Sequence, residues 1–235
     1  MGKALFATFL TFAVLPGVAL AQSGQRGEAT ARASDQKPGD VGDFDVAGVR
    51  LGMTYQEAKE ILTAKGFAMR DTSFGRWDYN TLIAQEANRR GQPIPAFKAP
   101  ADVPDLTSTD AAGNRVEVVF SSMKTGPEVA TIRLFFSSKS NDLAALPRDV
   151  VQKYGRPTQS NAPNIPPVYR WCEKRTSAGS CPPSFEPGVI MTFETSFGPQ
   201  IELTDWVAKE AQRKAEIAAM FAAPTADRQR SLLGS

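Results

Sequence analysis

The chain has 235 residues, and 27 Lys and Arg residues nearly balance 25 Asp and Glu residues, for a formal net charge of +2. This balance argues against the strongly basic surface by which proteins bind DNA or RNA. The chain contains no histidine, which excludes Ser-His-Asp and Cys-His catalysis and removes the commonest metal ligand. We therefore expect no nucleic-acid partner, no metal and no cofactor.

The first 21 residues have the pattern of a cleavable signal peptide. Lys3 supplies a positive charge, Ala4–Leu15 is apolar, and Pro16-Gly17 ends that stretch. The small residues of Ala19-Leu20-Ala21 form a cleavage site before Gln22. An uncleaved membrane anchor is the alternative, but it needs about 20 uninterrupted apolar residues. The sequence predicts a signal peptide over residues 1–21 and a periplasmic or secreted protein with no transmembrane segment.

Residues 22–42 are polar and rich in Gly, Ser and charge, which predicts a disordered linker before a single domain over residues 43–222. The domain opens with a well-marked helix, because Thr54 and Glu57 form a capping box and Gly66 supplies a helix stop. Residues 92–113 read as a long surface loop, since prolines and small polar residues dominate them. The expected helices are Tyr55–Lys65, Asp78–Arg90, Asp142–Tyr154 and Thr204–Ala222; the expected strands are Phe67–Ser73, Arg115–Ser122, Val129–Ser138, Val168–Glu173, Val189–Ser196 and Gln200–Leu203.

The order of these elements, a helix and then strands joined by short turns, occurs twice along the chain. This order predicts an α+β fold with an antiparallel sheet and helices packed on one face. It is also the order that an internal duplication of a helix-plus-meander unit would produce. Pro224 ends the last expected helix, and we expect residues 223–235 to form a flexible tail.

Two segments resemble a known family. The run from Val49 to Ala58, with Gly52-Met53-Thr54 at the helix entry, is similar to small outer-membrane assembly lipoproteins of the SmpA/OmlA type and to the duplicated β-lactamase-inhibitor-protein fold. The helix end and Gly-x-Pro of residues 150–157, followed by the aromatic strand at Tyr169, resemble the continuation of that fold. The chain lacks the lipid-attachment cysteine of those lipoproteins. The resemblance implies the fold and not their partner or activity.

The two cysteines, Cys172 and Cys181, flank a loop that contains Ser, Gly and Thr. In an oxidising compartment such a pair closes into a structural disulfide. A redox-active pair is the alternative, although it is normally a Cys-x-x-Cys motif at the start of a helix.

Carboxylates and aromatic residues are the remaining candidates for a functional site. Glu194 and Glu202 lie on strands joined by a short turn and could face each other as an acid/base pair, or each could be the solvent-facing member of an alternating strand. Tyr169 and Trp171 share one face of their strand and form a candidate binding surface, or they belong to the core.

The sequence as a whole favours a non-enzymatic protein that binds a partner protein or associates with the cell envelope. A binding function is consistent with the missing histidine. It is also consistent with the long loop at residues 92–113, because binding residues are often carried on loops. The alternative is a periplasmic hydrolase that uses carboxylates, for which the chain shows no motif. The sequence leaves the oligomeric state open.

Overall fold

The computed structural model describes residues 41–72, 78–139, 142, 144–161, 167–184, 186, 188–195 and 198–222. All of them belong to one compact unit that spans Gln36–Ser235. The predicted signal peptide, most of the predicted linker and the predicted tail lie outside the described residues. Val41 lies in the stretch that the sequence assigns to the linker, yet it is 3% exposed and packs in the main core. The folded part therefore includes at least Val41.

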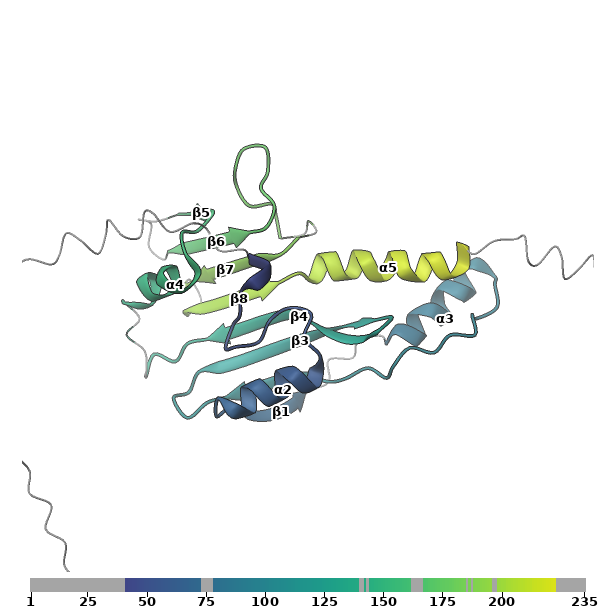
Figure 1. Cartoon of the computed structure of the whole chain (residues 1–235), viewed down its shortest axis with the longest axis horizontal. Helices are drawn as coiled ribbons and strands as arrows, with labels where there is room; N and C mark the ends of the chain where they lie inside the picture. Colours follow the sequence, from purple (N-terminus) through teal and green to yellow (C-terminus); the bar gives the residue numbers. More distant parts are fainter. Residues whose placement is uncertain are drawn as a thin grey trace, which may run out of the picture. The chain divides into compact units, whose positions relative to one another are not determined.

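The fold is built on one antiparallel sheet of eight strands in the order β1-β2-β3-β4-β8-β7-β6-β5 (Figure 1). Together with the helices, the sheet confirms the predicted α+β class. The strands are β1 (Ala68–Thr72), β2 (Asp105–Thr109), β3 (Arg115–Met123), β4 (Gly126–Phe135), β5 (Gln159–Ser160), β6 (Val168–Cys172), β7 (Ile190–Glu194) and β8 (Gln200–Thr204).

The helices divide the chain into two parts that have a similar order. A short 3-10 helix, η1 (Val41–Asp43), and α2 (Tyr55–Ala64) precede β1, and α3 (Tyr79–Arg90) lies between β1 and β2. The helix α4 (Leu146–Tyr154) precedes β5, and α5 (Trp206–Ala222) follows β8. The sheet joins the two parts through β4 and β8, where Ile132 lies opposite Leu203. The internal duplication stays a prediction.

Alternation along the strands gives the sheet one apolar and one polar face. Val116, Val118, Ile132 and Leu203 are fully buried and pack in the main core with side chains of α2 and α4. Side chains at intervening positions point to the opposite face, which we call the polar face; it carries Thr107, Glu117, Thr131, Arg133, Glu202 and Thr204. The polar face is therefore the one turned away from α2 and α4.

The first helix forms where its capping signals predict it. The Thr54 side chain accepts a hydrogen bond from the Glu57 backbone N–H, and the Glu57 carboxylate accepts one from the Thr54 N–H at 2.8 Å. Gly66 has φ +82°, which favours glycine, and there the Phe67 N–H bonds back to the Leu62 carbonyl. Burial of Leu62 on the sheet stabilises this packing by about 1.5–3 kcal/mol.

The second sheet-covering helix, α4, starts four residues later than the sequence predicts, at Leu146. Pro147 lies in its first turn, where a missing backbone N–H costs no helical hydrogen bond. At the other end, the Tyr154 hydroxyl donates to the Asp45 carbonyl at 2.8 Å, and the Lys153 ammonium lies 3.0 Å from the Asp45 carboxylate. These contacts hold the segment before α2 against α4.

The helices α3 and α5 pack against each other and form a second, smaller core. Its buried members are Tyr79, Ile83, Ala99 and Ile217. The Tyr79 hydroxyl donates to the Glu216 carboxylate at 3.3 Å, which joins the two helices. The helix α5 also contacts β3 and β4, so the second core lies beside the hairpin that these strands form (Figure 1).

The predicted surface loop over residues 92–113 is wrong in its second part, because β2 lies there and pairs with both β1 and β3. The strand has few apolar residues: Leu106 is its only large one. Its polar residues are used within the sheet, since the Asp105 carboxylate accepts the Phe120 N–H at 3.0 Å, where β3 has a bulge. A short polar strand of this kind resembles a loop in composition.

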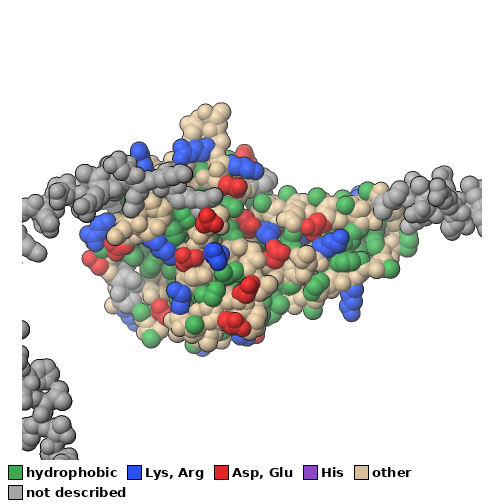
Figure 2. All heavy atoms as spheres, in the orientation of Figure 1, with side chains coloured by type: hydrophobic (Ala, Val, Ile, Leu, Met, Phe, Trp, Pro, Cys, Tyr) green, Lys and Arg blue, Asp and Glu red, His purple; other side chains and the backbone are tan. Residues whose placement is uncertain are grey.

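On the face shown in Figure 2, basic and acidic side chains are intermixed, as the near-neutral composition predicts. None of the helices in the described ranges is long and apolar enough to cross a membrane.

Candidate functional site

The predicted aromatic binding surface does not lie on the outside of the molecule. Trp171 is 0% exposed, and its indole N–H donates to the Gly155 carbonyl at 3.1 Å. Tyr169 is half-buried and stacks on Phe193 with ring centroids 5.9 Å apart. Both aromatic residues share one face of β6, as the sequence predicts, but that face packs in the main core. Trp171 therefore stabilises the fold and offers no surface to a partner.

The two cysteines form the predicted disulfide. Cys172 at the end of β6 and Cys181 in the following loop have Cα atoms 5.6 Å apart, and both are 7% exposed. They form a small buried cluster with Ile190, which lies opposite Cys172 in the sheet. The disulfide thus anchors the long β6–β7 connection to the end of β6, beside Ile190 at the start of β7.

Glu194 and Glu202 lie on the same face of the sheet, but the structure gives them separate partners. Glu194 lies opposite Gln200 and accepts a hydrogen bond from its side-chain amide. Glu202 lies opposite Thr192 on one side and opposite Arg133 on the other. Its Oε2 atom is 2.5 Å from Nε of Arg133. Each carboxylate is therefore held by a neighbouring strand.

A cavity of about 450 Å³ lies on the polar face and is the best candidate for a functional site. Strands β2, β3, β4 and β8 form its floor, and the end of the β6–β7 connection and the first residues of α5 form its walls. Apolar side chains that line it include Val119, Ile190, Trp206 and Val207. The sequence alone did not predict this cavity.

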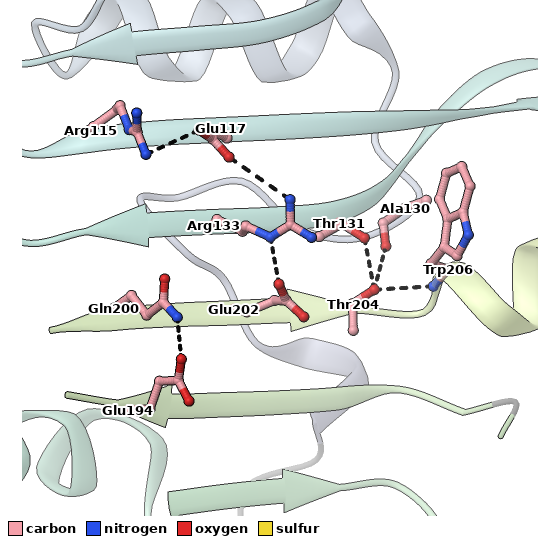
Figure 3. A network of polar contacts seen from close by, with 10 residues as sticks. All are labelled: Arg115, Glu117, Ala130, Thr131, Arg133, Glu194, Gln200, Glu202, Thr204 and Trp206. Carbon is pink, nitrogen blue, oxygen red and sulfur yellow. Dashed lines mark hydrogen bonds and ion pairs between the residues drawn. The ribbon is translucent and has the colours of Figure 1, made fainter. Parts of the chain in front are cut away.

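A row of charged side chains crosses three strands of the polar face (Figure 3). Glu117 and Arg133 lie directly opposite each other on β3 and β4, with Glu117 Oε2 3.9 Å from Arg133 Nη1. Arg133 continues the row to Glu202 on β8, and Arg115 is 3.3 Å from Glu117 at the other end. Pairing of opposite charges holds these side chains in place, and three of them, Glu117, Arg133 and Glu202, line the cavity floor.

Hydroxyl groups place Trp206 at the cavity wall. Thr131 and Thr204 lie opposite each other on β4 and β8, and their Oγ1 atoms are 2.7 Å apart. Thr204 Oγ1 also accepts the backbone N–H of Trp206 at 3.2 Å and donates to the Ala130 carbonyl (Figure 3). These bonds connect the first residue of α5 to the centre of the sheet, so Trp206 has a defined position beside the floor.

Asp205 lies between Thr204 and Trp206, two residues that line the cavity. Its Oδ1 atom is buried and has no hydrogen-bond partner within the described part of the chain. Burial raises the pKa of this carboxyl group to about 6, although the nearby Lys209 ammonium favours the ionised form. Lys209 itself is ion-paired with Glu128. The carboxyl group is therefore in an environment that disfavours its charge.

The sequence identifies Trp206 as an amphipathic residue. It does not predict that Arg133, Glu117, Thr131 and Thr204 lie close together. Each is the polar member of an alternating strand, a pattern that predicts only exposure. Their assembly depends on the pairing of β4 with β8, which are separated by most of the second half of the chain. Among the residues that the structure describes, no group of three or more acidic or cysteine side chains could hold a metal ion.

These features define a protein with an antiparallel sheet, the helices α2 and α4 on one sheet face and a lined cavity on the other. Comparisons with protein-family models, with curated proteins and with solved structures found no match.

Proposed function

We propose that this is a non-enzymatic binding protein that holds a partner protein on the polar face of its sheet. The observation that carries the proposal is the cavity of about 450 Å³ on that face. Binding sites are typically concave and combine apolar walls with a few fixed polar groups. The cavity has both, since Val119 and Trp206 lie beside the ion-paired Glu117 and Arg133.

Export to the periplasm or the exterior is part of the same proposal. Residues 1–21 have the signal-peptide pattern, and the disulfide between Cys172 and Cys181 is the kind of bond that persists in an oxidising compartment. A partner in the cell envelope is accessible from that location. The resemblance of residues 49–58 to outer-membrane assembly lipoproteins agrees with an envelope role.

Rigid placement of the polar groups favours binding over the alternative of a hydrolase that uses carboxylates. Glu117 and Glu202 both contact Arg133, and Glu194 is bonded to Gln200. These contacts fix the carboxylates within the sheet, where they shape and charge a surface. The chain also lacks histidine, the usual proton-transfer partner at neutral pH.

The test is affinity capture from a periplasmic extract with the purified protein and two variants. Val119→Trp places a large side chain on the cavity floor, in a strand that tolerates aromatic residues. Gln56→Trp adds the same side chain at an exposed position on α2, away from the polar face, and controls for nonspecific adhesion. Circular dichroism melting shows that each variant is folded.

We expect one stoichiometric partner that the native protein and Gln56→Trp retain equally and that Val119→Trp loses by about tenfold or more, since a blocked cavity removes the central contact. Equal capture by all three proteins would show that the cavity is not the binding site.

A further inference from the structure

The cavity has an unbalanced set of charged side chains. Four carboxylates and one guanidinium line it, a net formal charge of −3, whereas the whole chain carries +2. The carboxylates are those of Asp105, Glu117, Glu186 and Glu202, and the guanidinium is that of Arg133. The cavity is therefore locally acidic in a protein that is nearly neutral overall, and a cationic group complements it.

Two of these carboxylates can accept a further cation. Arg133 contacts Oε2 of Glu202, and Oε1 of Glu202 has no hydrogen bond to any part of the chain that the structure describes. Glu186 is exposed on the connection that forms the cavity wall and has no ion pair among the described residues. Asp105 is different, because it is 3% exposed and accepts the Phe120 N–H.

The remaining walls suit the apolar stem and the flat face of an arginine side chain. Trp206, Val119 and Val207 provide apolar surface, and Trp206 has the aromatic ring that binds a cation most favourably. Glu202 and Thr204 lie at alternate positions of β8, about 6.6 Å apart, and Trp206 begins α5 two residues after Thr204. Thr204 lies between Trp206 and Glu202 along the chain, so an arginine that enters beside Trp206 approaches Glu202 across Thr204 (Figure 3).

We propose that the cavity accepts an arginine side chain presented by an extended segment of the partner protein. The inference rests on the proposed binding function and adds the chemistry of the group that enters the cavity. The guanidinium binds the free oxygen of Glu202, and the alkyl chain packs on Trp206. Arginine fits better than lysine, because its planar guanidinium pairs with a carboxylate in a fixed geometry and is more weakly hydrated than an ammonium.

Titrations followed by NMR test this directly with isotope-labelled protein in low-salt buffer. The probes are capped Gly-Ser-X-Ser-Gly peptides in which X is arginine, lysine, citrulline or glutamate, and agmatine serves as a small guanidine without a peptide backbone. Citrulline has the shape of arginine but no charge. The indole N–H signal of Trp206, assigned with Trp206→Phe, reports occupancy of the cavity.

We expect the arginine peptide to shift the Trp206 signal and to bind about tenfold more tightly than the citrulline peptide, because a charge-assisted hydrogen bond is about twice as strong as a neutral one. Glu202→Gln should remove most of this preference, because it weakens binding of the arginine peptide more than binding of the citrulline peptide. Glu60→Gln removes a carboxylate from the exposed surface of α2 and should change neither affinity.

Any one of four results would overturn the proposal. Equal binding of the arginine and citrulline peptides, or tighter binding of the glutamate peptide, would show that the cavity does not select a cation. Agmatine that binds as tightly as the peptide would make the occupant a small guanidine compound. If no probe shifts Trp206 while Val119→Trp still loses the partner, the arginine inference fails and the binding function stands; if Val119→Trp also retains the partner, both fail.

Discussion

Ser108 has a buried hydroxyl group that lies in an apolar environment. It lies on β2, faces the main core opposite Val116, and is 3% exposed. Its Oγ atom has no hydrogen-bond partner within the described residues. An unsatisfied buried hydroxyl costs about 1–3 kcal/mol, so its removal should stabilise the protein.

We predict that Ser108→Ala raises the free energy of unfolding by about 1 kcal/mol, measured by urea denaturation. Ser121→Ala is the matched control, because Ser121 is equally buried but its hydroxyl donates to the Met123 sulfur. That control should give no gain. A loss of stability in Ser108→Ala would mean that the hydroxyl has a partner in solution.

Asp205 makes the stability of the protein depend on pH. The pKa of its carboxyl group in the folded protein is about 6, raised from 3.8 chiefly by burial. The folded state therefore binds more protons than the unfolded state between these two values, and stability falls as the pH rises from about 4 through 6. Above that range, the ionised carboxylate destabilises the fold.

We predict that Asp205→Asn raises the free energy of unfolding at pH 7.5 by about 1–3 kcal/mol, and that the gain disappears near pH 4. Thermal melts of both proteins across this pH range measure it. Asp78→Asn, at the start of α3, is the control, because asparagine also caps a helix well and should shift stability by less than about 0.5 kcal/mol. A gain in Asp205→Asn that is the same at all pH values would contradict the titration argument.

At the scale of elements, the sequence predicts those that carry strong local signals. Thr54, Glu57 and Gly66 mark both ends of α2, and alternating apolar residues mark β3 and β4. The sequence does not predict β2, because most of its residues are polar and some of them, such as Asp105 with the Phe120 N–H, find their partners only across the sheet. The cavity was missed for the same reason, since its floor depends on which strands pair.

The β6–β7 connection shows how one covalent bond supports the site. The disulfide between Cys172 and Cys181 closes a short loop and packs on Ile190, which lines the cavity. The chain-entropy model assigns a loop of this length about 2–3 kcal/mol of stabilisation. Its loss should therefore affect both the global stability and the wall of the cavity.

We predict that the double variant Cys172→Ala and Cys181→Ala has a free energy of unfolding about 2–3 kcal/mol lower than that of the native protein. We also expect it to bind the partner more weakly. Denaturation with and without reductant gives a direct control, since reductant should lower the stability of the native protein to that of the variant and leave the variant unchanged. Partner binding that is unaffected would show that Ile190 keeps its position without the disulfide.

At the scale of the whole molecule, the protein has two cores of very different size. The main core joins both parts of the sheet with α2 and α4, and it includes Trp171, Phe193 and Leu203. The second core, between α3 and α5, has few fully buried members, of which Tyr79 and Ile83 are the largest. Because less apolar area holds α3 and α5 together, they should open locally more easily than the sheet.

Native-state hydrogen exchange measures this difference. We predict that backbone amides in the last turns of α5 and in α3 exchange by local opening, with a free energy below that of global unfolding, whereas amides of β4 and β8 exchange only when the whole sheet unfolds. Ile83→Ala should lower the opening free energy of α3 and α5 by about 2–4 kcal/mol and change that of the central strands less. Equal protection in helices and strands would mean that the two cores unfold as one unit.

The first turn of α5 should behave like the sheet, because Thr204 accepts a hydrogen bond from the Trp206 backbone N–H and is itself bonded to Thr131 of the central strands. The cavity wall would then stay rigid while the far end of the same helix opens.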